Sequence, residues 1–586
     1  MGKNTTVKEM EDGFDLVQEI SQNSPNRSKK SPGGWRAVKY ILGNETFEKL
    51  ASMSLIGNMT VYLKTKFNMK GIAVVNVITI WGGSSNLTSI AGALVSDTFL
   101  GRYLTLLFGS ISSLLGMATI TLTAAVPELR PPKCQDLDNC IGPKLWQMGV
   151  LIAGLALLAI GAGGIRPCNI AFGADQFDTT TKKGRAQLES FFNWWYFTFT
   201  LALVIALTGV VYVQTNVSWA IGFAIPTACL FFSITIFVIG RHSYIMSKPQ
   251  GSVFVDIAKV IVASIRKHGI KGNYPFYDPE APGSESKISR TKRFSCLDKA
   301  AMIVNQNELN EQGKPKNEWR LCSVEKVENL KMLVGMLPVW VAGIFCFIVM
   351  DQQGTVGMLQ AIQSTKTIKS IPHFEIPPAW MNLSSMIALA IWIFIYEKIW
   401  VPQSKRMTGK PKRLSVTQRI NIGIVMSISC TLVAALTERH RRAEALKQGT
   451  FESPVSILLL LPQFALSGLI EAFAAVAVME FLTTQLPESM RTVAGAIFFV
   501  SLSIASYLNS VIVNIVYRTT RKSGTQWLGG PDLNEDRLEY YYCLIAGIGA
   551  MNLLYFNLFA RRFVTNNVRK EPEDEQKNEE RTLESA

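Results

Sequence analysis

Two glutamates and a lysine stand at the start of an apolar stretch, where "GNETFEKLA" is followed by "SMSLIGNMTVYL". Glu45, Glu48 and Lys49 are spaced i, i+3 and i+4, so a helix would place them on one face. The lysine charge favours ionised carboxylates, whereas partial burial favours protonated ones. These opposed effects can bring a carboxylate near the point of protonation, as a proton-coupled carrier requires. The alternative is a solvated helix start, in which glutamate stabilises the positive end of the helix dipole.

A second charged group, Arg166, lies in the segment "GAGGIRPCNIAFGADQF" (161–177). The glycines remove side-chain bulk, and Pro167 lacks an amide hydrogen and tends to kink a helix. A guanidinium on such a closely packed segment can bind a carboxylate, nitrate or sulfate through two parallel hydrogen bonds. It can also form a structural ion pair with Glu471 in "SGLIEAFAAVAVMEF". A pair that opens when substrate arrives would combine both roles.

The elements that carry these charges are membrane-spanning by length and composition. The chain has 586 residues, of which 48% are hydrophobic and 18% charged. It contains about twelve apolar stretches of roughly 20 residues, the length that crosses a bilayer. They lie near 45–65, 71–96, 103–126, 146–168, 191–213, 218–240, 331–352, 378–399, 419–437, 455–482, 491–517 and 541–560. The sequence predicts an all-α polytopic membrane protein with twelve transmembrane helices.

The longest hydrophilic stretch divides the predicted spans six and six, which suggests two six-helix bundles of the major facilitator type with a site at the midplane. The expected domains are a disordered cytosolic N-terminal tail (1–40), an N-terminal six-helix bundle (41–240), a cytosolic connector loop (241–330), a C-terminal six-helix bundle (331–562) and a disordered cytosolic C-terminal tail (563–586).

Charged residues intrude into every third predicted span. The first holds the Glu45 cluster, the fourth Arg166, the seventh Asp351 and the tenth Glu471. An ionisable group inside the bilayer costs about 3 kcal/mol or more, so it normally faces a partner or a wet cavity. In a major facilitator arrangement these four helices line the central cavity, where the charges would converge.

The net charge of +15 could suggest nucleic acid, but in a membrane protein the placement of the charge matters more. If the N-terminus is cytosolic, most lysines and arginines lie inside, which fits the positive-inside rule with both tails cytosolic. The exception is "ERHRRAEALK" (438–447), which is basic and predicted to lie outside. We therefore expect a lipid bilayer and no nucleic acid as the surroundings of this chain.

Several motifs resemble those of a known family. "ETFEK" is similar to the ExxE[K/R] motif of the plant nitrate and peptide transporter family, in the proton-dependent oligopeptide transporter superfamily. "GAGGIRPCNIAFGADQF" and "FFNWWYF" resemble its signature regions, and "DTFLGRYLT", "LDKAAMI" and "VENLKMLVGMLPVW" match further segments. The resemblance covers about 36–562 and is strongest with the subfamily that contains glucosinolate and low-affinity nitrate carriers.

The resemblance implies proton-coupled symport by alternating access, with protons as the coupling ion and no cofactor or metal. Glu45 and Glu48 would take part in proton transfer, with Lys49 as their charge partner. Arg166 stands where many relatives have lysine and would face Glu471 across the cavity. Because arginine stays charged, proton movement falls to the carboxylates.

The resemblance also narrows the substrate. The stretch "LASMSL" lacks the tyrosines with which peptide-carrying relatives contact a peptide, so dipeptides are not expected. Met350 stands where one nitrate-carrying branch has a histidine, which weakens nitrate without removing it. A glucosinolate-like or other glycosylated metabolite and nitrate remain, carried across the plasma membrane by a monomer or weak homo-oligomer.

Other candidate positions are weaker. Asp351, Gln352, Gln353 and Met350 are possible cavity contacts, although a packed polar network fits the two glutamines equally well. Asp97 and Arg102 would form a cytosolic gate, and Thr105 is a possible phosphorylation site. Cys134 and Cys140 share one predicted outer loop and could form a disulfide.

Two other classes of protein are alternatives to a proton-coupled carrier. An integral-membrane enzyme is not expected, because the spans hold no metal-ligand cluster or paired nucleophile and base, and the four histidines fall in predicted loops. A passive uniporter or channel for anions stays open, as does a carrier of nitrate alone.

Overall fold

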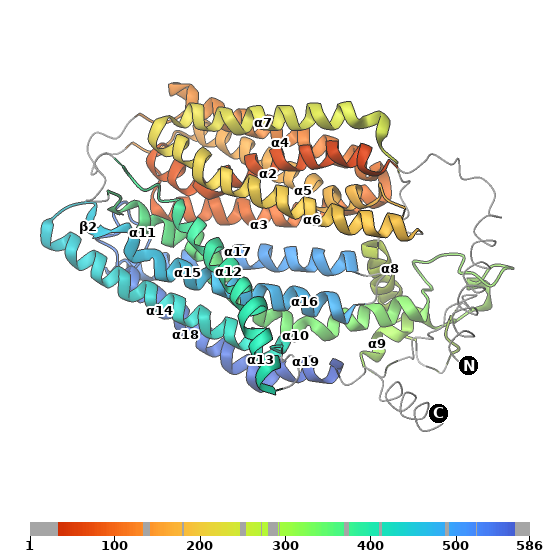
Figure 1. Cartoon of the computed structure of the whole chain (residues 1–586). Coiled ribbons are helices and arrows are strands. Elements are labelled where there is room, and N and C mark those ends of the chain that lie inside the picture. Colours follow the sequence, from red (N-terminus) through yellow and green to blue (C-terminus); the bar gives the residue numbers. More distant parts are fainter. Residues whose placement is uncertain are drawn as a thin grey trace.

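The protein is described here from a computed structural model, which describes residues 33–132, 141–178, 181–246, 253–270, 272, 274–278, 291, 293–367, 374–408, 413–486, 491–522 and 524–568. Long helices run side by side in two groups (Figure 1). The first group holds α2 (Gly34–Thr65), α3 (Gly71–Val95), α4 (Gly101–Ala125), α5 (Leu145–Ala174), α6 (Lys182–Ile205) and α7 (Trp219–Ile239). The second holds α10 (Val324–Gln352), α11 (Met358–Ile362), α12 (Trp380–Ile395), α13 (Val401–Thr408), α14 (Val416–Gln448), α15 (Leu461–Ile470), α16 (Val476–Gln485), α17 (Arg491–Lys522), α18 (Leu538–Tyr555) and α19 (Arg561–Val568).

The helices form an all-α membrane fold. Within the described residues, ten helical stretches are long and apolar enough to cross a membrane, and one of them, Gly71–Ala125, contains both α3 and α4. The more polar α2 is 32 residues long, enough to span a bilayer at 1.5 Å per residue. This arrangement is consistent with the twelve spans predicted. A short parallel pair of strands, β1 (Ser364–Thr365) and β2 (Ser453–Ser456), is the one addition to the helices that the described residues show.

Helix boundaries differ from the expected segment boundaries at several places. Helix α2 begins at Gly34, inside the stretch expected to be a tail, and α10 begins at Val324, inside the expected connector. Helix α14 continues to Gln448, so His440 is helical although a loop was expected there. Ser415 begins this helix with a capping box, and Gly449 terminates it in the left-handed conformation.

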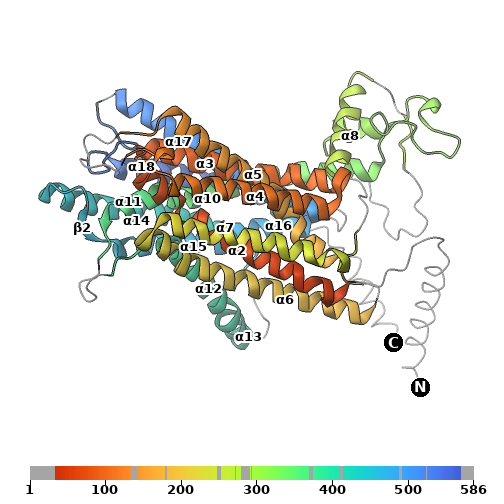
Figure 2. The ribbon, with the colours of Figure 1, turned by 90° about the horizontal axis from the view of Figure 1, so that it is seen from above.

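The connector forms a small packed unit at one end of the bundle, which we call the connector end. It contains α8 (Val253–Arg266) and α9 (Ser295–Asp298), and α19 lies at the same end (Figures 1 and 2). Val260 and Ala263 of α8 pack in one cluster with Val327 of α10. Lys331 of α10 pairs with Asp298 at 2.5 Å and with Glu328 at 2.8 Å. The connector is thereby fixed to the second group of helices.

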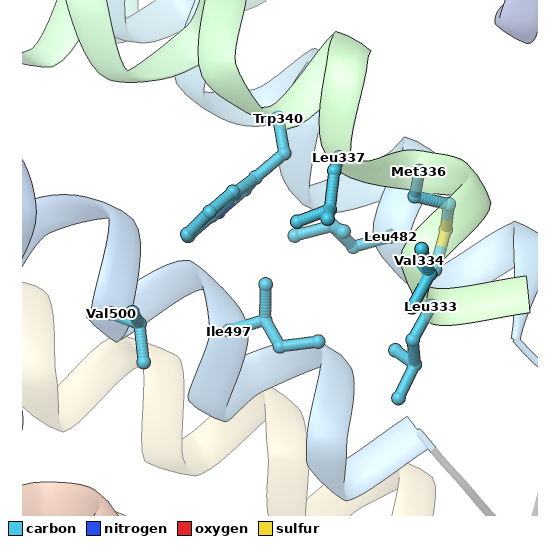
Figure 3. A pocket seen from close by; sticks show the side chains of 8 residues that line it. All are labelled: Leu333, Val334, Met336, Leu337, Trp340, Leu482, Ile497 and Val500. Carbon is cyan, nitrogen blue, oxygen red and sulfur yellow. The ribbon is translucent and has the colours of Figure 1, made fainter. Parts of the chain in front are cut away.

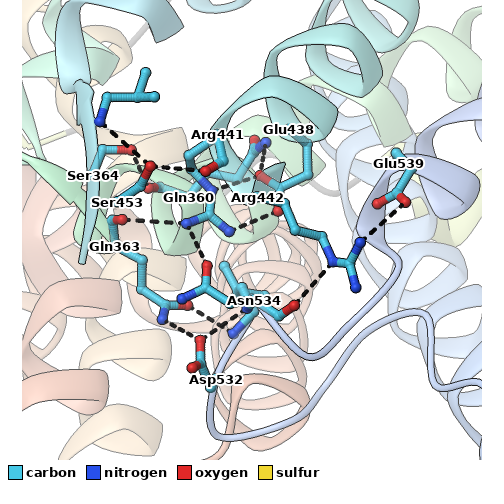
Figure 4. Close-up of polar contacts among 12 residues, drawn as sticks. Gln360, Gln363, Ser364, Glu438, Arg441, Arg442, Ser453, Asp532, Asn534 and Glu539 are labelled. Atoms are coloured by element: carbon cyan, nitrogen blue, oxygen red, sulfur yellow. Dashed lines mark hydrogen bonds and ion pairs between the residues drawn. The ribbon is translucent and has the colours of Figure 1, made fainter. Parts of the chain in front are cut away.

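The opposite end of the bundle, which holds β1 and β2 and is called the strand end below, contains a buried charge network (Figure 4). Arg441 is 1% exposed and Glu438 is fully buried. The Nε and Nη2 atoms of Arg441 donate to the two Glu438 oxygens at 2.8 and 2.7 Å. Its Nη1 donates to Asn534 Oδ1 at 3.0 Å, and Arg442 Nε donates to the Asn534 carbonyl at 2.9 Å. Both arginines are therefore satisfied within the protein, which accounts for two of the basic residues of this stretch.

The same network fixes the loop of residues 524–537, called the strand-end loop below. Gln363 Nε2 donates to Asp532 Oδ1 at 2.8 Å, and its Oε1 accepts from the Leu533 amide at 2.9 Å. The loop also reaches the first group of helices. Lys64 Nζ donates to the Pro531 carbonyl at 2.8 Å, and the Gly71 amide donates to the Gly530 carbonyl at 3.3 Å.

Helices α3 and α17 continue this junction between the two groups. Asn514 Nδ2 donates to Asn76 Oδ1 at 2.7 Å, Ser84 and Tyr507 pair at 2.9 Å, and Ser503 Oγ donates to the Gly83 carbonyl at 2.8 Å. Thr60 of α2 donates to the Gly354 carbonyl at 3.2 Å. These hydrogen bonds hold the two groups together at and near the strand end.

Candidate functional site

The charged cluster on α2 is buried. Glu45 is 1% exposed and Glu48 is 6% exposed. Lys49 Nζ lies 3.6 Å from Glu45 Oε1 and 3.2 Å from Glu48 Oε2. The helical spacing therefore brings all three side chains together as predicted. Their burial does not fit a solvated helix start, because buried charges are normally retained only where they are paired or functional.

Neighbouring helices fix α2 in this position. Asn44 Nδ2 donates to Ser233 Oγ of α7 at 2.7 Å, and Ser233 Oγ donates back to the Asn44 carbonyl at 2.9 Å. Asn169 Nδ2 of α5 donates to Glu45 Oε2. Asn169 was not singled out from the sequence, although it lies three residues after Arg166 and hence on the same face of α5. Because the Glu45 carboxylate accepts a hydrogen bond from Asn169 and lies beside Lys49, it is held in one orientation.

Arg166 lies where α5 and α3 approach closely. A Cβ atom added at Gly163 would meet the Thr88 carbonyl oxygen at 2.6 Å, so only glycine permits this approach. Helix α5 continues through Pro167 to Ala174. Arg166 Nη1 donates to Asn86 Oδ1 of α3 at 2.7 Å. The guanidinium is therefore anchored by a neutral amide, which leaves its charge uncompensated by that partner.

Glu48 and Arg166 line the same cavity. This cavity has a volume of ≈ 40 Å³, and its polar lining consists of Glu48, Ser52, Trp81, Ser85, Ser113 and Arg166. The helices that contribute these side chains are α2, α3, α4 and α5. A carboxyl group and a permanent cation thus face one small space. Such a pair can bind an anion and a proton in the same region.

Glu471 does not pair with Arg166, contrary to the expected salt bridge. Glu471 begins a π-helical turn between α15 and α16, in the second group of helices. Among the described residues no carboxylate oxygen lies within 4.0 Å of the Arg166 guanidinium. The guanidinium donates instead to Asn86 within its own group, and the hydrogen bonds that join the groups lie at and near the strand end. A charge pair across the groups is therefore not formed in this conformation.

The candidate contacts on α10 belong to a packed polar network. Gln352 Nε2 donates to the Tyr541 hydroxyl at 2.8 Å, and Gln353 Oε1 accepts from Gln463 at 3.2 Å. Asp351 accepts from Ser506 at 2.9 Å and from Asn509 at 2.6 Å, both on α17. These three residues and Met350 do not line the cavity of Glu48 and Arg166. The expectation of direct cavity contacts gives way to the alternative of a packed network.

The predicted gate residues have a different partner. Arg102 pairs with Asp175 at 2.5 Å, at the end of α5, rather than with Asp97. This partner could not be predicted from the sequence, because Asp175 follows α5 and comes close to Arg102 only when the helices pack together. Thr105 is 5% exposed, and its hydroxyl donates to the Gly101 carbonyl at 2.9 Å. A modifying enzyme could not reach Thr105 in this conformation.

Cys134 and Cys140 lie outside the described residues. In the part of the chain that the structure describes, no group of three or more metal-binding side chains is found. A second cavity, of ≈ 170 Å³, lies between α10, α16 and α17 and is lined by apolar side chains (Figure 3). The indole nitrogen of Trp340 beside it already donates to Ser501. This apolar space offers no charge for an anion, so the chemistry is concentrated around Glu48 and Arg166.

The chain is similar in sequence and in fold to known proteins. Residues 103–528 match the POT family. Protein NRT1/PTR FAMILY 2.8 of Arabidopsis thaliana is 59% identical over 557 residues, which are 94% of this chain and 99% of that protein. Protein NRT1/PTR FAMILY 2.13 of the same plant is 43% identical over 547 residues, 91% of this chain and 88% of that protein.

A solved structure with a similar fold is that of the POT family transporter PepTSo. It has a TM-score of 0.64 at 18% sequence identity and covers 91% of this chain and 99% of that chain. At this identity the likeness concerns the fold, which is the two-group helical arrangement described above. The motif resemblance is thereby confirmed at the level of the family. The chain belongs to the POT family of proton-coupled membrane transporters, in its NRT1/PTR branch, and is not an enzyme.

Proposed function

We propose that this chain is a symporter that imports an anionic or glycosylated small metabolite, a glucosinolate-like or other specialised-metabolite glycoside, and/or nitrate, by alternating access. The single observation that carries the proposal is the shared cavity of Glu48 and Arg166. An anion near Arg166 is attracted by a charge that forms no ion pair with a described carboxylate, and a proton on Glu48 removes the repulsion between that anion and the carboxylate. Anion and proton then stabilise each other's binding.

The cycle follows from this coupling. A proton and an anion enter together, the junction at the strand end closes, and both leave toward the connector end when the Glu48 carboxyl releases its proton. Asn169 and Lys49 hold the Glu45 and Glu48 carboxylates in position throughout. We place both termini and the connector in the cytosol and the protein in the plasma membrane. In this arrangement 41–240 and 331–562 act as the two moving bundles.

The cavity volume favours nitrate as a second candidate. A pocket for a drug-sized ligand occupies about 300–1,000 Å³, far more than the ≈ 40 Å³ beside Arg166. A glycoside could place only its anionic group at Arg166, with its remainder between the two groups of helices. Nitrate could bind Arg166 as a whole.

Uptake competition tests the proposal. Oocytes that express the chain would receive nitrate, a glucosinolate, a flavonoid glycoside and a dipeptide together, at acidic and at neutral external pH. We expect the anionic probes to accumulate and to evoke inward current only at acidic pH. Accumulation without pH dependence or current would instead indicate a passive uniporter, and uptake of nitrate alone would restrict the substrate to that anion.

A further inference from the structure

The cavity beside Glu48 contains buried polar atoms that have no hydrogen-bond partner among the described residues. They are Trp81 Nε1 and Ser85 Oγ. Glu48, which also lines the cavity, pairs through its Oε2 atom with Lys49 Nζ at 3.2 Å. Buried polar groups in proteins almost always have a partner, which is often an ordered water molecule. Two unpartnered buried atoms of residues that line one cavity indicate that something polar occupies it.

The cavity has the size and lining that water requires. Its volume is ≈ 40 Å³, whereas one water needs about 10–15 Å³ of such space and two to four polar partners. Trp81 and Arg166 supply donors, Glu48 supplies an acceptor, and the hydroxyls of Ser52, Ser85 and Ser113 supply both. The space therefore suits about three waters.

We propose that this cavity holds a buried water cluster that carries the proton to and from Glu48, and that Trp81 and Ser85 are positioning residues of this route. The inference rests on the proposed proton-coupled function. In the loading step a hydronium ion in the cavity gives its proton to Glu48 Oε2. One hydronium O–H bond breaks, the carboxyl O–H bond forms, and a neutral water remains; release is the reverse.

The surrounding charges leave Glu48 as the proton acceptor of this cavity. Glu45 and Lys49 face it from its own helix, and Arg166 faces it from α5. Helices α3 and α7 carry no charged residue, and Arg102 is the one charged residue of α4. Arg166 stays protonated, and Glu45, which accepts from Asn169, does not line the cavity. The indole N–H of Trp81 can only donate, so it orients a water oxygen toward itself and leaves the hydrogens of that water for the Glu48 carboxylate.

Radiolytic hydroxyl-radical footprinting tests the presence of water without relying on transport. Water held beside a buried side chain leads to its oxidation, so we compare two methionines in the purified full-length chain. Met117 is 1% exposed and lines the cavity, whereas Met59 is 0% exposed and does not. We expect Met117 to be oxidised at least ten-fold faster than Met59. Equal, slow oxidation of both would show a dry cavity and overturn the inference, even if the chain transports its substrate as proposed.

Substitutions test the proton route. Ser85→Ala and Trp81→Phe remove one polar atom each, and Ser89→Ala is the matched control. The Ser89 hydroxyl donates to the Ser85 carbonyl at 3.2 Å, one turn further along α3, and does not line the cavity. The readouts are acid-driven uptake and counterflow exchange of nitrate or the glucosinolate, whichever accumulates in the competition assay.

We expect both variants to lose at least five-fold in acid-driven uptake, with a displaced pH profile, while counterflow and the Ser89→Ala variant keep wild-type rates. Retained acid-driven uptake in both variants would overturn the proposed route. Equal losses of uptake and counterflow would also overturn it, because they would show that the side chains only stabilise the fold.

Discussion

Glu48 and Arg166 face one cavity from two different helices, α2 and α5, without forming an ion pair with each other. A neutral amide, Asn86, anchors the cation, and Lys49 accompanies the acid. If the two had paired directly, each would neutralise the other and neither would be available for substrate or proton. Their separation leaves a carboxyl group and a fixed cation facing the same space, as the proposed coupling of proton and anion requires.

Neutralising Glu48 should abolish the coupling of uptake to the proton gradient. Glu48→Gln removes the exchangeable proton but keeps the side-chain size, so we expect acid-stimulated uptake to disappear, a loss of at least ten-fold, while delivery to the cell surface is unchanged. Uptake and surface labelling in oocytes measure both. Glu444→Gln is the control, since Glu444 pairs with exposed Lys447 away from the cavity. Acid stimulation that persists in Glu48→Gln would refute the assigned role.

Removing the positive charge of Arg166 should reduce the transport of anions more than that of neutral molecules. Arg166→Ala deletes the charge but leaves Asn86 able to bind water, so we expect anionic substrates to lose about 2 kcal/mol of binding or more, in the range of hydrogen bonds to charged groups. Transport of a neutral probe should fall less. Arg166→Lys should restore part of the anion uptake, because it restores charge without the planar fork. Equal losses for charged and neutral probes would instead indicate that Arg166 is structural.

The close approach of α3 and α5 should be sensitive to a single methyl group. Gly163→Ala places a Cβ 2.6 Å from the Thr88 carbonyl oxygen, so we expect a loss of about 1–3 kcal/mol of stability and a displaced Arg166. Gly149→Ala, on the same helix, meets no atom within 4 Å and should be neutral or slightly stabilising. Thermal unfolding of the purified variants in detergent measures the difference. Indistinguishable melting temperatures would contradict the proposed packing role.

The buried pair at the strand end should be costly to break. Arg441→Ala leaves Glu438 fully buried without its partner, so we expect a loss of about 3–5 kcal/mol. The double variant that also carries Glu438→Ala should lose less than the sum of the two single variants, because no charge is left buried alone. Lys447→Ala is the control: its ion pair with Glu444 is exposed, and such pairs contribute about 0–1 kcal/mol. Additive losses would argue against direct coupling of Arg441 and Glu438.

Asp536 in the strand-end loop should make stability depend on pH. Burial raises the pKa of Asp536 to about 6, against a hydrogen bond from the Gly530 amide that lowers it. Because the folded pKa is above the ordinary value of 3.8, the folded state binds this proton more tightly, and the stabilisation is lost as the pH rises through about 6. Nearby Asp532 and Glu535 raise this pKa further.

We therefore expect the melting temperature of the wild type to rise on acidification from neutral pH toward pH 5. Asp536→Asn carries no such proton, so its melting temperature should change less over the same range. Parallel curves for the two proteins would show that Asp536 does not titrate in this window.

Spacing along one helix could be predicted from the sequence, whereas contacts between helices could not. Glu45, Glu48 and Lys49 meet because their spacing alone places them together. Arg102 and Asp175, by contrast, meet only through the packing of α4 on α5. Hydropathy likewise located the spans, since apolar length is a local property.

The expected pair of Arg166 and Glu471 is not formed in this conformation, for a related reason. It depends on how the two groups of helices are placed relative to each other, which no motif encodes. The Glu438–Arg441 pair shows the same limit. Its i, i+3 spacing is visible in the basic stretch, but its burial depends on Asn534 and Gln363, which arrive from distant segments.

In the proposed cycle a substrate enters at the strand end, so the hydrogen bonds between α3, α17 and the strand-end loop would also affect how tightly it binds from that side. A molecule arriving there can enter only the fraction of chains in which these bonds are broken. Its apparent dissociation constant is then the intrinsic constant divided by that fraction. Weak affinity for an external substrate can therefore arise from the stability of this junction, and evolution could tune uptake at Asn76 or Lys64 without altering a single contact to the cargo.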